Sequence, residues 1–181
     1  MLHHLTCSTV WTERPTMLET LLIYTIGHSD HTTAAFVDLL RRHGITLVVD
    51  VRSQPYSRWA HQFNRETLAR DLQEAGMPYE YMGDVLGGRP ADPALYDPQQ
   101  EGPDYQRVEQ TPAYQAGIDR LLELARAGRV AVMCGEGDHR HCHRHLLITQ
   151  TLLARGVRVL HIQPNGGTVE GEPVTRQLSL F

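Results

Sequence analysis

An alternation of short apolar runs with helical patterns limits the fold of this chain more than any other sequence feature. The apolar runs are rich in aliphatic and β-branched residues, as expected for buried strands, and they cover residues 21–26, 46–51, 79–82, 130–133 and 157–162. Such an alternation favours right-handed crossovers between parallel strands. We therefore predict an α/β domain with a mostly parallel, five-stranded sheet and helices on both faces, in a Rossmann-like three-layer arrangement.

The rest of the sequence divides into one domain with two tails. Residues 1–20 show no period and are predicted to form a loose N-terminal tail, and residues 21–163 form the α/β domain. Within that domain, residues 90–112 are rich in Pro, Asp, Gln and Glu, which predicts a loop or lid. Residues 164–181 are predicted to form a flexible linker followed by a docking peptide.

Composition narrows the cellular setting. The formal net charge of -4 argues against a surface that coats nucleic acid generally, but it allows a local basic cleft. Three cysteines without the spacing of a disulfide framework indicate a reducing compartment. The sequence shows neither an apolar run long enough to cross a bilayer nor the pattern of a signal peptide. We therefore expect a cytoplasmic protein with no membrane partner.

The stretch from Val130 to His145 contains the densest group of reactive residue types. Its apolar run ends at Cys134, and two glycines break the strand before a helical pattern begins. Arg140 and Arg144 stand among four histidines at the start of that helix, where free backbone N–H groups also attract anions. This stretch predicts an anion-binding site at the end of a buried strand.

Polar or glycine residues follow four of the predicted strands, at 28–29, 52–53, 87–88 and 134–136. Because the carboxyl ends of parallel strands meet at one edge of a sheet, we expect these residues to surround a crevice. Arg52 needs an anionic partner, either a bound ligand or an internal carboxylate of Asp50 or Glu136. The predicted catalytic residues are Glu136, His28 and Cys134, and the predicted anion-binding residues are Arg52, Arg144, Ser29, Gly87, Gly88 and His143.

Several of these segments together resemble one protein family. They are Thr25–Ser29, Val49–Arg52, Pro55 with Ser57, Tyr81 with Leu86–Gly88, Met133–Cys134 with Glu136, and Cys142–Arg144. In this order they resemble the family called domain of unknown function DUF488, over residues 23 to 162 of this chain. The resemblance implies a compact α/β domain but no settled reaction.

The cysteines of the same stretch allow three interpretations. Cys134 and Arg140 have the Cys-x5-Arg spacing of thiol phosphatases and sulfurtransferases, although Glu136 inside that loop would repel a phosphate. Cys134, Cys142 and His143 could instead bind zinc, but their spacing is not that of the common zinc motifs. In the third interpretation, Cys134 is a small buried apolar residue. The sequence therefore predicts no metal and no cofactor.

An aromatic and basic segment follows the second predicted strand. It contains four ring side chains and two arginines, namely Tyr56, Trp59, His61, Phe63, Arg58 and Arg65. Such a segment is typical of a groove in which nucleic-acid bases stack on rings. It is equally typical of a surface loop that two buried aromatic residues hold in place.

Residues Gln177 to Phe181 resemble the pentapeptide by which bacterial DNA-replication and repair proteins bind the sliding clamp. In that mode of binding, Gln177 fixes the register while Leu180 and Phe181 fill an apolar pocket, with Leu178 between them in the motif. The alternative is that the same apolar residues fold back onto the domain. We expect clamp binding, because a linker precedes the peptide.

These features together predict a DNA-repair or DNA-processing factor. Its crevice would bind a phosphate or a nucleotide, and its docking peptide would recruit it to the sliding clamp. One alternative is a cytoplasmic thiol-dependent enzyme, similar to phosphatases or sulfurtransferases, that uses Cys134. Another is a module that binds phosphate without catalysis.

Overall fold

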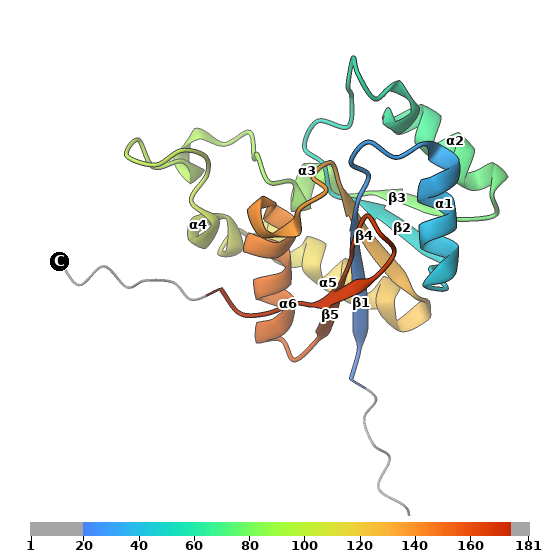
Figure 1. Cartoon of the computed structure of the whole chain (residues 1–181). Helices are drawn as coiled ribbons and strands as arrows, with labels where there is room; N and C mark the ends of the chain where they lie inside the picture. Colours follow the sequence, from blue (N-terminus) through green and yellow to red (C-terminus); the bar gives the residue numbers. More distant parts are fainter. Residues whose placement is uncertain (1–19, 175–181) are drawn as a thin grey trace, which may run out of the picture.

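The computed structural model describes residues 20–174 and contains a six-stranded sheet with the order β3-β2-β4-β1-β5-β6 (Figure 1). The strands are β1 (Leu22–Gly27), β2 (Leu47–Asp50), β3 (Tyr79–Tyr81), β4 (Val130–Cys134), β5 (Arg158–Ile162) and β6 (Thr168–Glu170). The first five are parallel, and β6 is antiparallel to β5. The predicted α/β class and the mostly parallel sheet are confirmed.

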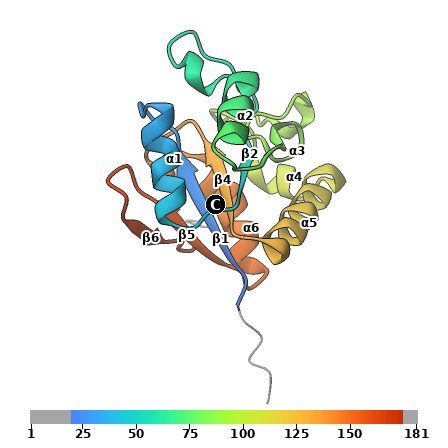
Figure 2. The same ribbon diagram turned by 90° about the vertical axis from the view of Figure 1, so that its right-hand side faces the viewer.

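Helices cover both faces of this sheet (Figures 1 and 2). The α-helices are α1 (Thr33–Arg42), α2 (Arg65–Glu74), α3 (Gly83–Leu86), α4 (Tyr105–Glu109), α5 (Pro112–Ala127) and α6 (Gln150–Ala154). Short 3-10 helices occur at His61–Phe63, Pro93–Leu95 and His139–His141, and a π-helix occurs at Arg144–Thr149. Within residues 20–174, every helix is too short or too polar to span a bilayer.

Side-chain alternation along the strands divides the core into two layers. On one face, alternate strand residues such as Val48 and Met133 pack with Phe36 of α1 and Leu68 of α2. On the other face, residues such as Val49, Val132 and Val159 pack with Ile118 and Leu121 of α5 and with Ile148 and Leu152. The parallel strands are therefore buried on both sides, which explains their continuous apolar runs.

The sixth strand lies in the stretch predicted to be a linker. β6 pairs with β5 so that Leu160 aligns with Glu170 and Ile162 with Thr168. The chain reverses between them at Gly166, whose φ of 87° suits glycine best. A three-residue strand with one apolar residue, Val169, carries no readable period, and for this reason the sequence did not reveal it. The docking peptide, residues 177–181, lies outside the described residues.

The segment predicted as a loop or lid is irregular but contains local structure. Besides α4 and the 3-10 turn at Pro93–Leu95, it contains an antiparallel bridge between Tyr96 and Pro103. It extends away from the sheet in Figure 1, on the side of α3. Tyr105, at the start of α4, reaches the cavity described below.

Candidate functional site

The C-terminal ends of β1, β2 and β4 lie side by side. Gly27 of β1 aligns with Cys134 of β4, and Asp50 of β2 aligns with Met133. α1 follows β1 on one face of the sheet, whereas the helix after β4 packs on the other face. The connections that leave β1 and β4 therefore diverge at this edge. Ligand crevices of open α/β sheets lie at such points of divergence.

A cavity of about 320 Å³ lies at this edge. Its lining includes Arg52, Ser53, Gln54, Gly88, Arg89, Tyr105, Cys134, Glu136, His141, Cys142 and His143. The residues come from the loops after β2 and β4, from the loop after α3 and from α4. Three of the four predicted strand-end groups therefore contribute to one cavity.

Three buried side chains form the floor of this cavity. The ligand atoms of Cys134, Cys142 and His143 all lie within 4.8 Å of one another. Nδ1 of His143 is 3.7 Å from Sγ of Cys134 and 3.8 Å from Sγ of Cys142. Nε2 of His143 donates to the carbonyl oxygen of Val51 at 3.1 Å, which fixes Nδ1 as the nitrogen that faces both sulfurs.

The pKa values of the two thiols are shifted in opposite directions. A hydrogen bond from the Cys142 thiol lowers the pKa of Cys134 to about 3, and His143 and the backbone N–H of Glu136 act in the same direction, against desolvation. The same hydrogen bond and burial raise the pKa of Cys142. Cys134 is therefore the group that first becomes a thiolate.

Arg52 is paired inside the protein. Its Nε and Nη2 donate to the two carboxylate oxygens of Asp50 at 2.9 Å and 2.6 Å, and Nη2 also donates to the Phe63 carbonyl. Tyr79 donates a further hydrogen bond to the same carboxylate. This is the internal ion pair that the sequence allowed as an alternative. Among the described residues, Nη1 of Arg52 has no hydrogen-bond partner, so it is the donor that remains for a ligand in the cavity.

Arg144 is buried beneath the loop that follows β4. Its side chain is 0% exposed, and Nη1 and Nη2 donate to the carbonyl oxygens of Glu136 and Gly137 at 2.6 Å and 2.9 Å. The loop approaches so closely that a Cβ on Gly27 would lie 1.9 Å from the Glu136 carbonyl oxygen. Arg144 does not line the cavity. Its contacts hold the loop in place, whereas the sequence predicted that it binds an anion.

His28 and Ser29 lie beside the cavity and do not line it. The His28 ring stacks on Phe63 with ring centroids 4.3 Å apart, and Nδ1 bonds to the Ser29 carbonyl. Burial lowers the pKa of His28. Ser29 has a φ of 47°, and its backbone N–H donates to the Gly135 carbonyl. Both residues therefore join the end of β1 to the loop after β4.

Gly87 and Gly88 allow close packing at the cavity wall. A Cβ on Gly88 would lie 2.5 Å from the His143 ring, and a Cβ on Gly87 would lie 2.2 Å from the Gly83 carbonyl oxygen. The backbone N–H of Arg89 donates to Oγ of Ser53. Gly88 therefore lets the loop after α3 pack against the imidazole of His143, whereas Gly87 lets the same loop pack against Gly83 and Ser53.

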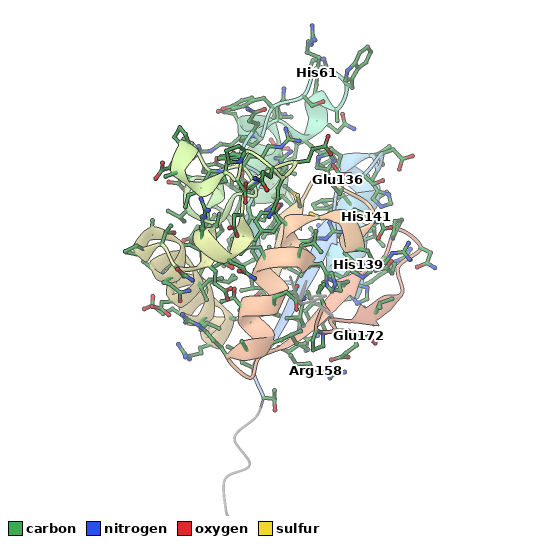
Figure 3. The ribbon with its side chains drawn as sticks, turned by 90° about the vertical axis from the view of Figure 1, so that its left-hand side faces the viewer. His61, Glu136, His139, His141, Arg158 and Glu172 are labelled. Atoms are coloured by element: carbon green, nitrogen blue, oxygen red, sulfur yellow. The ribbon has the colours of Figure 1, made fainter. Side chains whose placement is uncertain are left out.

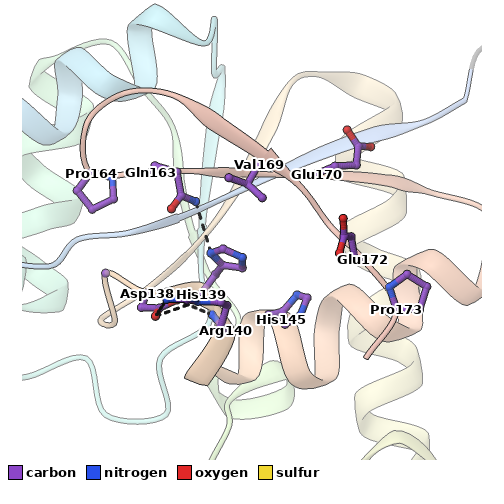
Figure 4. Close-up of a pocket in the computed structure, with 11 residues that line it drawn as sticks. Asp138, His139, Arg140, His145, Gln163, Pro164, Val169, Glu170, Glu172 and Pro173 are labelled. Carbon is purple, nitrogen blue, oxygen red and sulfur yellow. Dashed lines mark hydrogen bonds and ion pairs between the residues drawn. The ribbon is translucent and has the colours of Figure 1, made fainter. Parts of the chain in front are cut away.

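Arg140 lies away from Cys134. Its guanidinium pairs with Asp138 at 2.8 Å and is 72% exposed. It lines a second cavity, of about 640 Å³, together with His139, His145 and residues of β6 (Figure 4). A Cys-x5-Arg enzyme needs its arginine over the thiolate, so this geometry does not support that interpretation of Cys134. Glu136 is exposed and lines the Cys134 cavity.

The aromatic segment after β2 separates into exposed and buried rings. Trp59 is 92% exposed and Tyr56 is 60% exposed, whereas Phe63 is 1% exposed and packs edge-on against Phe36. In Figure 3, His61 lies near the tip of this protruding segment, and Glu136 and His141 lie between it and His139. The segment therefore presents rings to solvent and is held by a single buried one.

Sequence reasoning missed how the site is assembled. Arg89, Tyr105 and His141 line the cavity but gave no motif. Cys142 and His143 were considered as ligands with Cys134, and a useful signal was available: a strand-end cysteine followed, after a glycine loop, by a Cys-His pair. Such a loop can fold the pair back onto the strand end, as it does here.

Comparison with known proteins identifies one relationship. Residues 32–150, more than half of the chain, match the model of the family described as "Domain of unknown function DUF488". The matched range includes every residue that lines the Cys134 cavity, whereas Thr25–Ser29 precedes it. No curated protein and no solved structure matches the chain.

Proposed function

Because the chain belongs to the family of the domain of unknown function DUF488, whose description assigns no reaction, we propose a function from the site itself. We propose that the protein is a DNA-processing or DNA-repair factor. In this proposal, the cavity at the sheet edge binds a phosphate of a nucleotide or of a nucleic-acid strand. The sliding clamp is the partner that recruits the protein.

The cavity wall supports the phosphate part of the proposal. Nη1 of Arg52 and the exposed side chain of Arg89 bring cationic donors to the cavity, and Ser53 and Gln54 add neutral donors. Charge-assisted hydrogen bonds from arginine are well suited to phosphate oxygens. Glu136 is the exposed carboxylate of the same wall, where it is placed to act as an acid or a base.

The exposure of Trp59 is the single observation that most favours a nucleic acid over a small anion. A tryptophan that is 92% exposed buries almost none of its apolar surface within the described structure. It follows the cavity residues Arg52–Gln54 along the same loop. Exposed rings combined with cationic side chains are the usual means of binding single-stranded bases.

Binding of a fluorescent single-stranded oligonucleotide tests this proposal. Trp59→Ala should weaken binding about 5- to 150-fold, because stacking contributes about 1–3 kcal/mol per base, whereas Trp59→Phe should retain most of the affinity. Arg89→Ala should reduce the slope of log affinity against log salt concentration by about one, as expected for the loss of one phosphate contact. Arg126→Ala, an exposed position at the end of α5, is the control. Equal affinity of all four variants would reject nucleic-acid binding.

A turnover assay separates an enzyme from a binding module. Glu136→Gln should keep oligonucleotide affinity and lose any processing activity, because it removes an acid or base without removing a cationic contact. If the wild-type protein binds the strand without processing it, the module interpretation holds. The lowered pKa of Cys134 suits a nucleophile. However, Arg140 lines the other cavity, which argues against a thiol phosphatase.

Recruitment rests on sequence alone, because residues 177–181 lie outside the described structure. Replacing both Gln177 and Phe181 by alanine should abolish binding to the purified sliding clamp, since the register contact and the pocket-filling ring are lost together. Ser179→Ala should bind normally. Retained binding by the double variant would reject the docking peptide while leaving the nucleic-acid proposal intact.

A further inference from the structure

The three side chains at the floor of the cavity offer two sulfurs and one nitrogen to a common point. We propose that Cys134, Cys142 and His143 form a binding site for a thiophilic divalent metal ion of the zinc class. Two thiolates and an imidazole are a donor set that zinc uses in proteins. This inference does not depend on the proposed function, because it rests on the geometry of these three residues.

The distances between the donor atoms fit a tetrahedral ion. Zinc–sulfur bonds of about 2.3 Å and zinc–nitrogen bonds of about 2.0 Å place a sulfur and a nitrogen about 3.6 Å apart. Nδ1 of His143 lies 3.7 Å and 3.8 Å from the two sulfurs. Both nitrogen–sulfur distances are therefore close to those around a tetrahedral zinc ion, and all three donor atoms lie within 4.8 Å of one another.

The surroundings of His143 are those of a metal ligand. Nε2 donates to the Val51 carbonyl, so the lone pair of Nδ1 is directed to the sulfurs. A ligating histidine usually has such a backbone partner for its second nitrogen, which fixes both the tautomer and the ring plane. Gly88 packs against the ring from the other loop and leaves no room for a Cβ.

A buried cation and backbone N–H groups act against the burial and the hydrogen bond with Cys134 that raise the pKa of Cys142. Among the described residues, Arg144 is a buried cation without a carboxylate partner, and its charge acts on both Cys134 and Cys142. Its backbone N–H and that of Glu136 also stabilise negative charge on Cys142 and Cys134, respectively. A loop that supplies N–H groups and a buried cation to two thiols offsets the cost of deprotonating them.

The site has an open side. All three ligand residues line the cavity, and so does Glu136. A metal held by three protein ligands keeps a fourth position for water or a ligand, in contrast to structural zinc sites, which are closed by four protein ligands. We therefore expect the fourth position to face the cavity, with the Glu136 carboxylate in the same space.

Metal uptake by the purified protein tests the inference without any nucleic acid. Cys7 lies outside the described residues and is replaced by serine throughout, so that the measured thiols belong to the site. We expect one equivalent of zinc per chain, and a cobalt(II) complex with the charge-transfer absorption of thiolate ligands. Cys142→Ser should weaken cobalt binding by more than about 100-fold, because loss of a direct ligand costs more than loss of an outer contact.

His61→Ala is the control, because His61 is an exposed histidine that does not line the cavity of Cys134, Cys142 and His143. It should bind cobalt as the wild type does. A second measurement covers the case in which a cysteine variant does not fold: zinc should protect two thiols of the parent protein from a thiol-reactive disulfide reagent. Absence of the thiolate absorption, unprotected thiols at saturating zinc, or uptake unchanged in folded Cys142→Ser would each overturn the site.

Discussion

Buried Arg144 is held by backbone carbonyls where a carboxylate would be the usual partner. Its two terminal nitrogens donate to Glu136 and Gly137, and its Nε is buried with no hydrogen-bond partner among the described residues. Desolvation accordingly lowers its pKa. These two hydrogen bonds hold the loop after β4 over the end of β1, so Arg144 fixes the backbone of Glu136 and Gly137.

Replacing Arg144 by methionine should lower the free energy of unfolding by about 2–4 kcal/mol. Two buried carbonyls lose charge-assisted hydrogen bonds, and each such bond contributes about 1.5–3 kcal/mol, partly offset by relief from burying a charge. Arg140→Met, four residues earlier and 72% exposed, should change it by less than about 0.5 kcal/mol. Urea unfolding measures both. Equal effects of the two substitutions would contradict the structural role of Arg144.

Individual residues show why the site was only partly predictable. The positions of Arg52, Gly88 and Cys134 at one edge follow from the parallel direction of the strands, which the alternation of apolar runs and helical patterns indicates. The partner of a side chain depends on rotamers and on loops that carry no period. The pairing of Arg52 with Asp50, offered only as an alternative, and the inward turn of Arg144 are of this kind.

Among the helices and strands, those with a regular hydrophobic period could be predicted from the sequence, whereas those without one could not. The five parallel strands lie where the apolar runs predict them, and α1 begins after Thr32, whose hydroxyl caps it. The helix after β4 instead begins as a π-helix, in which Thr149 Oγ1 donates to the Arg144 carbonyl at 2.6 Å. β6 was missed because Val169 is its one apolar residue and it lies in a stretch rich in glycine and proline.

The β5–β6 hairpin gives a prediction at this scale. Gly166 has a φ of 87°, so Gly166→Ala should strain the turn and lower stability by about 1–2 kcal/mol. Gly167→Ala is the neighbouring control, since its φ is not in the left-handed region and its Cβ would meet only Oδ1 of Asn165 at 3.3 Å. Hydrogen exchange at the Gly171 amide, which bonds to the Val159 carbonyl, should accelerate in the first variant alone.

Across the whole molecule, the segment after β4 separates two cavities of different character. One side carries the cysteines and faces the loops after β2 and α3. The other side carries His139 and His145 and faces the β5–β6 hairpin (Figure 4). Beneath it, His161 of β5 is 0% exposed, stacks on His139 with ring centroids 4.1 Å apart, and bonds to Thr25 and His145. The segment after β4 therefore contacts both the buried His161 of the sheet and the cavity that contains the cysteines.

This histidine cluster should make stability depend on pH. Desolvation, with the charges of His139, His145 and Arg144, lowers the pKa of His161 to about 3 from its ordinary 6.5. Between pH 6.5 and pH 3, His161 therefore binds a proton in the unfolded chain but not in the folded protein. Stability is complete above pH 6.5 and is lost as the pH falls toward 3, by about 2 kcal/mol between pH 7 and pH 5. Burial lowers the pKa of His139 and His145 in the same direction.

Urea unfolding at several pH values measures this slope. His161→Asn removes the titrating group, so its stability should change with pH by about 2 kcal/mol less than that of the wild type over the same range, whatever its absolute stability. Arg140→Met, which removes no group that titrates between pH 5 and pH 7 and whose side chain is 72% exposed, should keep the wild-type slope. An unchanged slope in His161→Asn would show that His161 does not contribute to the pH dependence of stability, which would contradict this prediction.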